Sequence, residues 1–253
     1  MSLGLATLAG AELVHEVVRH LPRRNGHAYG VCLVLDADRT LSIEDTGRSV
    51  GAALGLNDQI RSIFERLGYE DDAFSAVSAV WSAVDVSAYS SEIERVAESV
   101  ALRDCWQQIL GDVLGEVPVV VLTAGIPQIW RKVLERHGFL GVPVLGGSHS
   151  ALDDYVVSAR AKGDVVRALR DEGWLVLAAG DSCVDLPMLA AADAALFVPD
   201  SKGSPALRAA LADMKMASVC HLIVDEQRFD DLDSCLPSDV PQLIFQGGMN
   251  IAN

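Results

Sequence analysis

Four short and almost continuous apolar runs constrain the fold of this 253-residue chain more than any other feature. They cover residues 29–35, 118–122, 174–179 and 194–198. Runs of this kind are typical of strands that are buried on both faces, as in a parallel sheet. Helical patterns lie between the later runs, over 127–137, 162–172 and 185–192. The alternation predicts an α/β fold built on a doubly wound parallel sheet.

Residues 42–116 show a different pattern, with no strand-like run. Five helical stretches follow one another there, over 47–54, 58–67, 72–84, 90–102 and 104–115. We predict that 42–116 is a small helical cap domain. It interrupts a core domain made of 1–41 and 117–253, and it would lie over the strand ends and close a site there.

The two ends of the chain have simpler patterns. Residues 10–22 have the apolar spacing of an amphipathic helix. The tail has an apolar run over 221–224 and a late one over 241–245, which we interpret as edge strands.

Composition excludes several classes of function. The net charge of −15, without a basic run, argues against a protein that binds a nucleic acid duplex. The five cysteines form no CxxC pair and no cluster with histidine, which favours the reduced thiols of a cytoplasmic protein over a zinc or disulfide site. No apolar run reaches the roughly 18 residues needed to span a bilayer, so we expect no membrane partner.

The segment Asp36-Ala37-Asp38-Arg39-Thr40 follows the first apolar run directly. Two carboxylates at this spacing can face one substrate from the loop after a strand. One can attack phosphorus, and the other can protonate the leaving alkoxide and later activate water. A solvated loop is the alternative interpretation of this segment taken alone.

A second acidic segment, 180–185, follows the third apolar run and contains Asp181 and Asp185. Closely spaced carboxylates at a strand end suit Mg²⁺, which takes oxygen ligands. The metal would offset the repulsion between these carboxylates and a phosphate dianion. The alternative is a helix start with favourable acidic residues.

Two further residues stand between these segments. Thr123 ends the second run, and together with the backbone amides at Ala124 it can hold phosphate oxygens. Lys162 opens a helical pattern and can neutralise charge in a transition state. Taken singly, the first would be a helix cap and the second a surface lysine. His149 is expected at the surface, and Cys183 is given no role.

The four segments occur in the order DxDxT, hhhT, K and GDxxxD. In this order and placement the chain resembles the haloacid dehalogenase (HAD) superfamily over residues 31–200. The resemblance implies a Rossmann-like core, with Asp36 as nucleophile and Asp38 as general acid and base. It implies that Thr123 and Lys162 bind the phosphoryl group.

The same resemblance implies a Mg²⁺ site. Its ligands would be Asp36, the backbone carbonyl of Asp38, and Asp181, with Asp185 in support. The second aspartate of the first motif, Asp38, points to phosphate chemistry rather than to dehalogenation, since dehalogenase members lack that acid.

Within the superfamily, the chain resembles most the phosphoserine phosphatase branch, which has a helical cap. That branch has a glutamate nine residues after the nucleophile, where this chain has Asp45. The cap stretch FERLGYEDDAF keeps Arg66 and Phe74 at matching places. We therefore expect Asp45 and Arg66 to contact the substrate, Arg66 as a clamp for a carboxylate or a second phosphate. A solvated helix arginine is the alternative for Arg66.

These observations predict a Mg²⁺-dependent phosphatase that acts on a small phosphorylated metabolite through an aspartyl-phosphate on Asp36. A phosphotransferase or a nucleotide or sugar 5'-phosphatase of the same superfamily is the first alternative. A non-catalytic regulatory protein with the same fold is the second.

Overall fold

The structure is a computed structural model that describes residues 7–8, 17, 21, 30–114, 117–153, 155–198, 207, 209–210 and 219–221. Of the helix expected over 10–22, only Val17 and Leu21 are described, and both are buried. The predicted late strand over 241–245 lies outside the described residues.

A six-stranded parallel sheet forms the centre of the molecule, in the order β4-β3-β2-β6-β7-β8. Its strands are β2 (Val31–Leu35), β3 (Val119–Leu122), β4 (Val144–Leu145), β6 (Leu175–Gly180), β7 (Ala194–Phe197) and β8 (Val219–His221). Along the chain this sheet begins with its inner strand β2, continues outward through β3 and β4, and then crosses to β6, β7 and β8 on the other side of β2. This is the predicted doubly wound arrangement, and its order reverses at β2.

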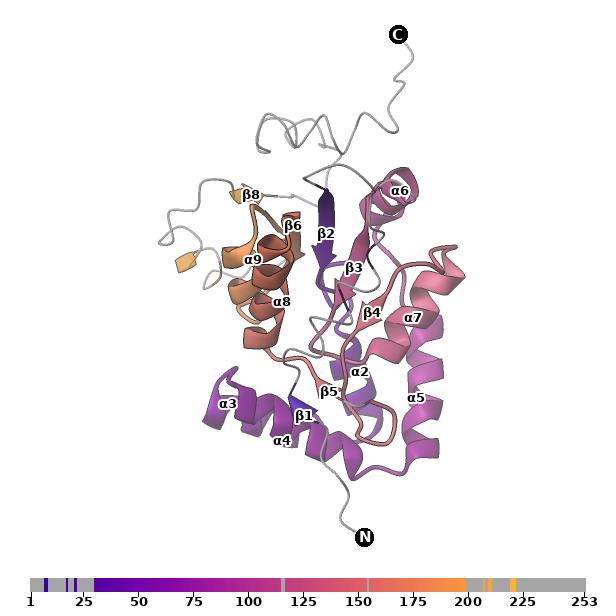
Figure 1. Cartoon of the computed structure of the whole chain (residues 1–253). Coiled ribbons are helices and arrows are strands. Elements are labelled where there is room, and N and C mark those ends of the chain that lie inside the picture. Colours follow the sequence, from indigo (N-terminus) through magenta and orange to yellow (C-terminus); the bar gives the residue numbers. More distant parts are fainter. Residues whose placement is uncertain are drawn as a thin grey trace.

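The sheet is covered by helices on both faces, as the continuous apolar runs require. Alternate side chains of β2 point to opposite faces. Leu33 and Leu35 pack with α6 (Asp104–Val113) and α7 (Pro127–Arg136), whereas Cys32 and Val34 pack with α8 (Ala159–Asp171) and α9 (Leu186–Ala191). Figure 1 shows these two helix pairs on either side of the strands.

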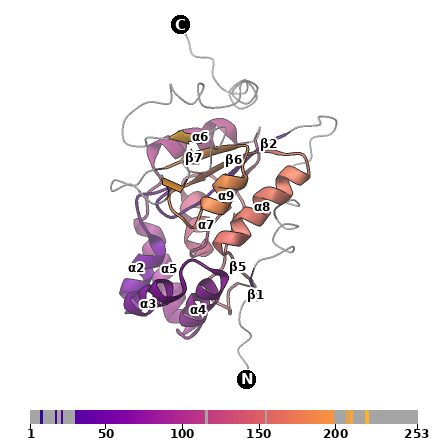
Figure 2. The ribbon, with the colours of Figure 1, turned by 90° about the vertical axis from the view of Figure 1, so that its left-hand side faces the viewer.

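Four of the helices between β2 and β3 lie beyond the carboxyl ends of the strands, and we call them the cap helices. They are α2 (Thr46–Ala53), α3 (Asn57–Leu67), α4 (Asp71–Ser82) and α5 (Val86–Ser99). Both views place them on that side of the sheet (Figures 1 and 2). The predicted helical stretches therefore agree closely with the observed ones.

The helix α6 differs from the cap helices in its position. Its buried residues Trp106, Leu110 and Val113 pack in the cluster that covers one face of the sheet. The division into a core and a cap over 42–116 stays a prediction, and α6 lies physically with the core.

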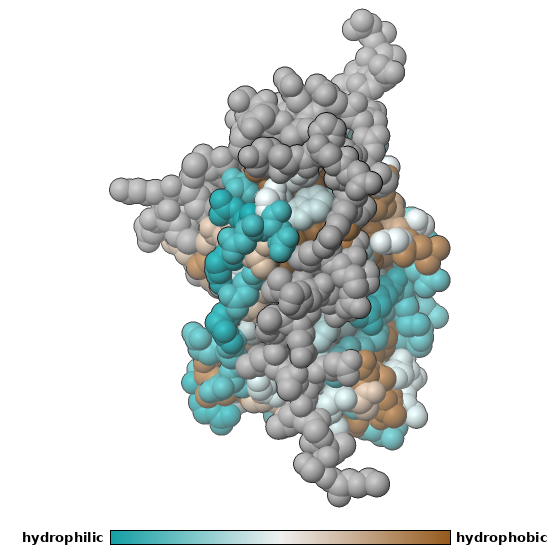
Figure 3. All heavy atoms as spheres, viewed as in Figure 1, coloured by the Kyte–Doolittle hydropathy of each residue, from teal (hydrophilic) through white to brown (hydrophobic). Residues whose placement is uncertain are grey.

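A small second sheet pairs β1 (Thr7–Leu8) in parallel with β5 (Tyr155–Val156). It lies beside α4. Hydrophilic side chains gather on the outer side of α8 (Figure 3), where Arg160 and Arg167 both pair with Asp164. Among the described helices, none combines the length and the apolar character that a bilayer span requires.

Candidate active site

Three predicted site residues follow three adjacent strands and lie at one edge of the sheet. Asp36 comes after β2, Thr123 after β3 and Asp181 after β6, and the last residue of β2, Leu35, pairs with the next-to-last residues of β3 and β6. The backbone amide of Asp36 donates to the carbonyl of Ala179, 2.8 Å away, so β2 and β6 stay paired up to the acidic residue. All three residues line one cavity of about 630 Å³.

Lys162 reaches the same cavity from α8, one turn after Ser158, the N-cap residue of that helix. Its side chain is 1% exposed, and Nζ lies 2.5 Å from Asp36 Oδ1 and 2.6 Å from Asp185 Oδ1. The surface-lysine interpretation is therefore wrong. Burial lowers the pKa of the Lys162 ammonium, but the charges of Asp185 and Asp36 outweigh this and hold the pKa above its usual value.

Asp36 is buried and has a partner on each carboxylate oxygen. Oδ1 accepts from Lys162, and Oδ2 accepts from the hydroxyl of Thr40 at 3.1 Å. Burial and the nearby charge of Asp185 raise the pKa of Asp36 to about 6, against the lowering effect of Lys162. At neutral pH Asp36 is therefore mainly ionised, which is the form of a carboxyl group that can act as a nucleophile.

Asp185 is fully buried, and its hydrogen bonds hold Lys162 and the loop after β6 in place. Besides Lys162, it accepts from the amides of Asp181 and Ser182 and from the Ser182 hydroxyl, at 3.1–3.2 Å through Oδ2. The close packing depends on Gly180, because a Cβ there would lie 2.5 Å from Asp185 Cβ. Asp185 stands at the start of α9, yet its side chain makes no cap hydrogen bond to that helix.

The carboxylates of Asp36, Asp181 and Asp185 each offer an oxygen, and these atoms lie within 4.8 Å of one another. Burial and the charges of Asp36 and Asp185 raise the pKa of Asp181 to about 8, although Arg39 lies 3.2 Å away and lowers it. Three buried carboxylates thus exceed the positive charge beside them. This donor set fits a divalent cation such as Mg²⁺, which prefers carboxylate oxygens.

Asp38 lies on the other side of the cavity and does not belong to this cluster. Its Oδ1 accepts from the amide of Thr46 at 2.7 Å. Burial and the charge of Asp45 raise the pKa of Asp38 to about 7, although the bond from Thr46 lowers it. A carboxyl with this pKa can carry a proton at neutral pH and give it up, as an acid and base catalyst must. The role of its backbone carbonyl as a metal ligand stays a prediction.

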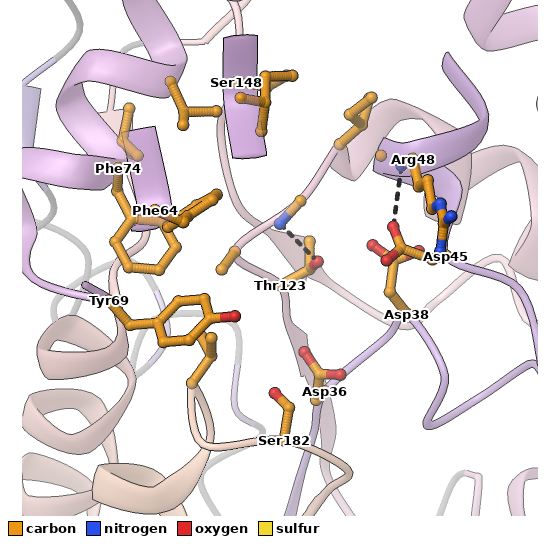
Figure 4. Close-up of a pocket in the computed structure, with 18 of the residues that line it drawn as sticks. Asp36, Asp38, Asp45, Arg48, Phe64, Tyr69, Phe74, Thr123, Ser148 and Ser182 are labelled. Carbon is orange, nitrogen blue, oxygen red and sulfur yellow. Dashed lines mark hydrogen bonds between the residues drawn. The ribbon is translucent and has the colours of Figure 1, made fainter. Parts of the chain in front are cut away.

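Of the residues predicted to hold substrate, all but Arg66 line the cavity. Thr123, Ala124 and Asp45 line the cavity, and Asp45 also caps α2 by accepting from the amide of Arg48 at 2.9 Å. Thr123 Oγ1 accepts from the Gly125 amide at 3.0 Å. Figure 4 shows Asp36 and Thr123 in the middle of the cavity, with Asp38, Asp45 and Arg48 on one side.

Arg66 does not belong to the residues that line the cavity, and its side chain is exposed on α3. The position favours the alternative of a solvated helix arginine, and the substrate clamp at Arg66 stays a prediction. Arg61 and Arg48 line the cavity instead. The reason is the periodicity of the helix. Arg61 lies three residues before the inward Phe64 and therefore on the same face of α3, whereas Arg66 lies two residues after Phe64 and therefore on another face.

His149 is also placed differently from the expectation, because it is buried rather than at the surface. Its ring lies 5.0 Å from the ring of Tyr89, and Nε2 is 3.2 Å from the carbonyl oxygen of Val84. Tyr89 in turn shares a hydrogen bond of 2.7 Å with Ser148. This buried contact joins α5 to the loop after β4.

Two further parts of the cavity were not predicted from the sequence. They are Arg39 and the apolar side chains that α3 and α4 contribute to the lining. Arg39 lies between the two motif aspartates and Thr40, and it has a left-handed backbone with φ of 61°. The apolar face of α4 could have been predicted, because its cavity-lining residues recur in the sequence at helical spacing.

The fold is similar to that of several solved structures. A phosphoserine phosphatase solved with bound substrate is 18% identical, with a TM-score of 0.55 over 81% of this chain and 99% of that one. A HAD family hydrolase from Salmonella enterica subsp. enterica serovar Typhi is 16% identical, with a TM-score of 0.57 over 84% of this chain and 72% of that one. The chain has the haloacid dehalogenase fold.

A further similar structure is that of a phosphoserine phosphatase, solved as an analogue of its phospho-aspartyl intermediate. It is 17% identical, with a TM-score of 0.55 over 82% of this chain and all of that one. The sequence by itself matches no protein-family model and no curated protein. At these identities the likeness establishes the fold, and the chemistry rests on the residues of the cavity.

Proposed function

We propose that this chain is a Mg²⁺-dependent phosphatase that hydrolyses a small phosphomonoester through an aspartyl-phosphate on Asp36. One observation carries the proposal. Asp36 and Asp38 line the same cavity, but only Asp36 is held by the buried ammonium of Lys162. Their environments therefore suit an ionised nucleophile and a proton carrier, respectively.

The first half of the reaction transfers the phosphoryl group to the enzyme. An oxygen of Asp36 attacks phosphorus, the bond from phosphorus to the leaving oxygen breaks, and Asp38 gives its proton to that oxygen. Thr123 and the amides after β3 hold the phosphoryl oxygens, and Lys162 balances their charge. The product alcohol leaves, and the phosphoryl group stays on Asp36.

The second half releases the phosphoryl group to water. Asp38, now ionised, takes a proton from a water molecule that attacks phosphorus. The bond between phosphorus and Asp36 breaks, so that inorganic phosphate leaves and both carboxyl groups return to their starting states. Asp36 and Asp181 would hold Mg²⁺, which supplies charge compensation for the phosphoryl oxygens when bound. Asp185 keeps Lys162 and the 181–182 amides in place.

The test is the turnover of an aryl phosphate with Mg²⁺ by the unchanged protein and by Asp36→Asn. We expect the substitution to lower kcat by about 10³-fold or more, as the loss of a nucleophile does. Asp164→Asn, which changes a partly exposed aspartate of α8 outside the cavity, is the matched control and should retain activity. Equal turnover by Asp36→Asn and the unchanged protein would contradict the proposal.

A second measurement tests the covalent step without turnover. Beryllium fluoride with Mg²⁺ should raise the melting temperature of the unchanged protein, because it mimics a phosphoryl group on an aspartate. Asp36→Asn should show no such rise. If phosphorylated products form only when an acceptor alcohol is added, the chain is a phosphotransferase rather than a hydrolase.

A further inference from the structure

One wall of the cavity is formed by an uncharged face of α4 and by two apolar residues of α3. On α4 the lining residues recur at intervals of three and four, which places them on one side of the helix. These residues are Phe74, Val77, Ser78 and Trp81, and α3 adds Ile60 and Phe64. Phe64 and Phe74 pack edge to face, with ring centroids 5.4 Å apart.

Apart from Arg61, the charged side chains that the cap contributes to the cavity lie away from this wall. In Figure 4, Asp38, Asp45 and Arg48 are on the side opposite Phe64 and Phe74. Arg61 lines the cavity from α3, but 62% of its side chain is exposed and it pairs with Asp58 at 3.0 Å. An ammonium or carboxylate group pressed against the wall would lose water without gaining a partner, which is costly.

Ser78 is the polar member of the α4 face. It is 3% exposed, and its hydroxyl has no hydrogen-bond partner among the described residues. A buried hydroxyl without a partner is unfavourable unless a bound molecule or water satisfies it. Since Ser78 lines the cavity, a ligand that reaches the wall can supply that hydrogen bond.

Tyr69 extends the wall toward the reacting centre from the loop between α3 and α4. It packs against Phe64 with ring centroids 5.1 Å apart, yet it is 53% exposed. Figure 4 shows its hydroxyl directed into the cavity, on the side of Asp36 and Thr123. An apolar group beside Asp36 would cover this exposed ring and gain contact area on both partners.

We infer that the leaving group of the substrate is an alcohol with a bulky apolar body, such as an aromatic ring, and one hydrogen-bonding atom for Ser78. The inference rests on the proposed phosphatase activity and names its substrate class. Small amino-acid and polyol phosphates fit the wall poorly, because their charged or hydroxyl groups would face apolar side chains.

The first experiment compares 2-phenylethyl phosphate with ethyl phosphate and phosphoserine. All three release a primary alcohol, so differences in kcat/KM report mainly on the contacts of the leaving group. Burial of a phenyl ring predicts a kcat/KM about 10- to 100-fold higher for 2-phenylethyl phosphate than for ethyl phosphate. Equal values for these two, or a preference for phosphoserine, would overturn the inference.

The second experiment locates the effect on α4. Phe74→Ala should lower kcat/KM for 2-phenylethyl phosphate by about tenfold or more and leave that for ethyl phosphate within about twofold. Val80→Ala is the matched control, because Val80 is 8% exposed on the same helix and does not itself line the cavity. Equal losses for both substrates with Phe74→Ala would show that the wall does not contact the leaving group.

A third experiment tests the hydrogen bond at Ser78 with the three hydroxyphenyl isomers of 2-phenylethyl phosphate. One isomer should exceed the unsubstituted compound by about fivefold, a typical gain for a neutral hydrogen bond. Ser78→Ala should abolish that difference. No preferred isomer, or a preference that survives Ser78→Ala, would remove Ser78 from the inference.

Failure of the inference can be told apart from failure of the proposed function. Hydrolysis of ethyl phosphate that depends on Asp36, without a gain for the phenyl compound, would reject only the substrate class. If no phosphomonoester is hydrolysed and beryllium fluoride with Mg²⁺ does not stabilise the protein, the phosphatase proposal itself fails.

Discussion

The ammonium of Lys162 lies 2.6 Å from the carboxylate of Asp185, and each side chain is 1% exposed. Asp185 also accepts from two backbone amides, so its position is set by the chain around it. Lys162 is thereby held against the proposed nucleophile Asp36 before any substrate binds. A charge that is already oriented needs little rearrangement during the reaction, which makes it more effective.

The first prediction concerns Lys162→Met. Removal of the ammonium leaves two buried carboxylates without compensation, so we expect a loss of about 3–5 kcal/mol in the free energy of unfolding at pH 8. The loss should be smaller at pH 5, because the pKa of Asp36 is about 6 and the carboxyl then becomes protonated. Urea unfolding without divalent cations measures both values.

The matched control is Lys132→Met. Lys132 pairs with Glu94 at the surface, where 41% and 59% of the two side chains are exposed. Such pairs contribute at most about 1 kcal/mol. Equal destabilisation by the two lysine variants would contradict the account of the buried pair.

The second prediction concerns the pH dependence of Mg²⁺ binding. The pKa values of Asp36 and Asp181 are raised from 3.8 to about 6 and about 8, so the metal-free site holds protons near neutral pH. Mg²⁺ requires the ionised forms and must release these protons. We expect affinity to fall by up to about tenfold per pH unit from pH 8 toward pH 6. Calorimetry in buffers of different ionisation enthalpy measures the released protons, and Asp181→Asn should release fewer.

The third prediction concerns the stability of the metal-free protein. A carboxyl whose pKa is higher in the folded state than in the unfolded state stabilises the fold below the unfolded value. That contribution is lost as the pH rises through the folded value. For Asp36 and Asp181 the loss runs from about pH 4 to pH 8. Thermal unfolding with EDTA should therefore show a smaller fall in Tm between pH 6 and 8.5 for Asp181→Asn than for the unchanged protein.

The fourth prediction concerns a contact between α4 and α8. Asp71, in the first turn of α4, accepts from the hydroxyl of Ser158 and from Arg160 Nε, each at 2.6 Å. Ser158 caps the helix that carries Lys162. Asp71→Ala should raise KM severalfold and speed hydrogen exchange in α4, because a tie between cap and core is lost.

Asp72→Ala is the control for Asp71→Ala. Asp72 is exposed in the same helical turn, so it shares the interaction with the helix dipole but not the contact with α8. Faster exchange in both variants would assign the effect to the helix start rather than to the contact.

The fifth prediction concerns Arg103 as a positioning residue. It donates to the carbonyl of Ser42 at 3.1 Å and to that of Arg39 at 3.0 Å, and so holds the loop that follows Asp38. Arg103→Met should lower kcat by about tenfold with little change in KM, since misplacement of catalytic groups acts mainly on the reacting state. Arg95→Met, which removes an exposed pair with Glu92, should leave kcat unchanged. A change in KM alone would contradict a positioning role.

Local patterns were sufficient for most elements of the fold. The run that became β2 was expected over 29–35 and is observed over Val31–Leu35, and α7 was expected over 127–137 and is observed over Pro127–Arg136. The two-residue strand β4 (Val144–Leu145) was not predicted, because two residues show no periodicity. The strands β1 and β5 also have two residues each and were not predicted for the same reason.

The sequence by itself determined the order of strands and helices and the residues that end the strands. The carboxyl ends of parallel strands meet at one edge, so the sequence predicts that Asp36, Thr123 and Asp181 lie along that edge. The tertiary structure decided that the strands before them are direct neighbours. Only the tertiary structure decided which side chains of the cap enter the cavity. It placed Arg61 there and Arg66 in solvent, and it buried His149. Those outcomes depend on how α3 and α5 are rotated and packed, and that rotation is set by contacts between residues far apart in the chain.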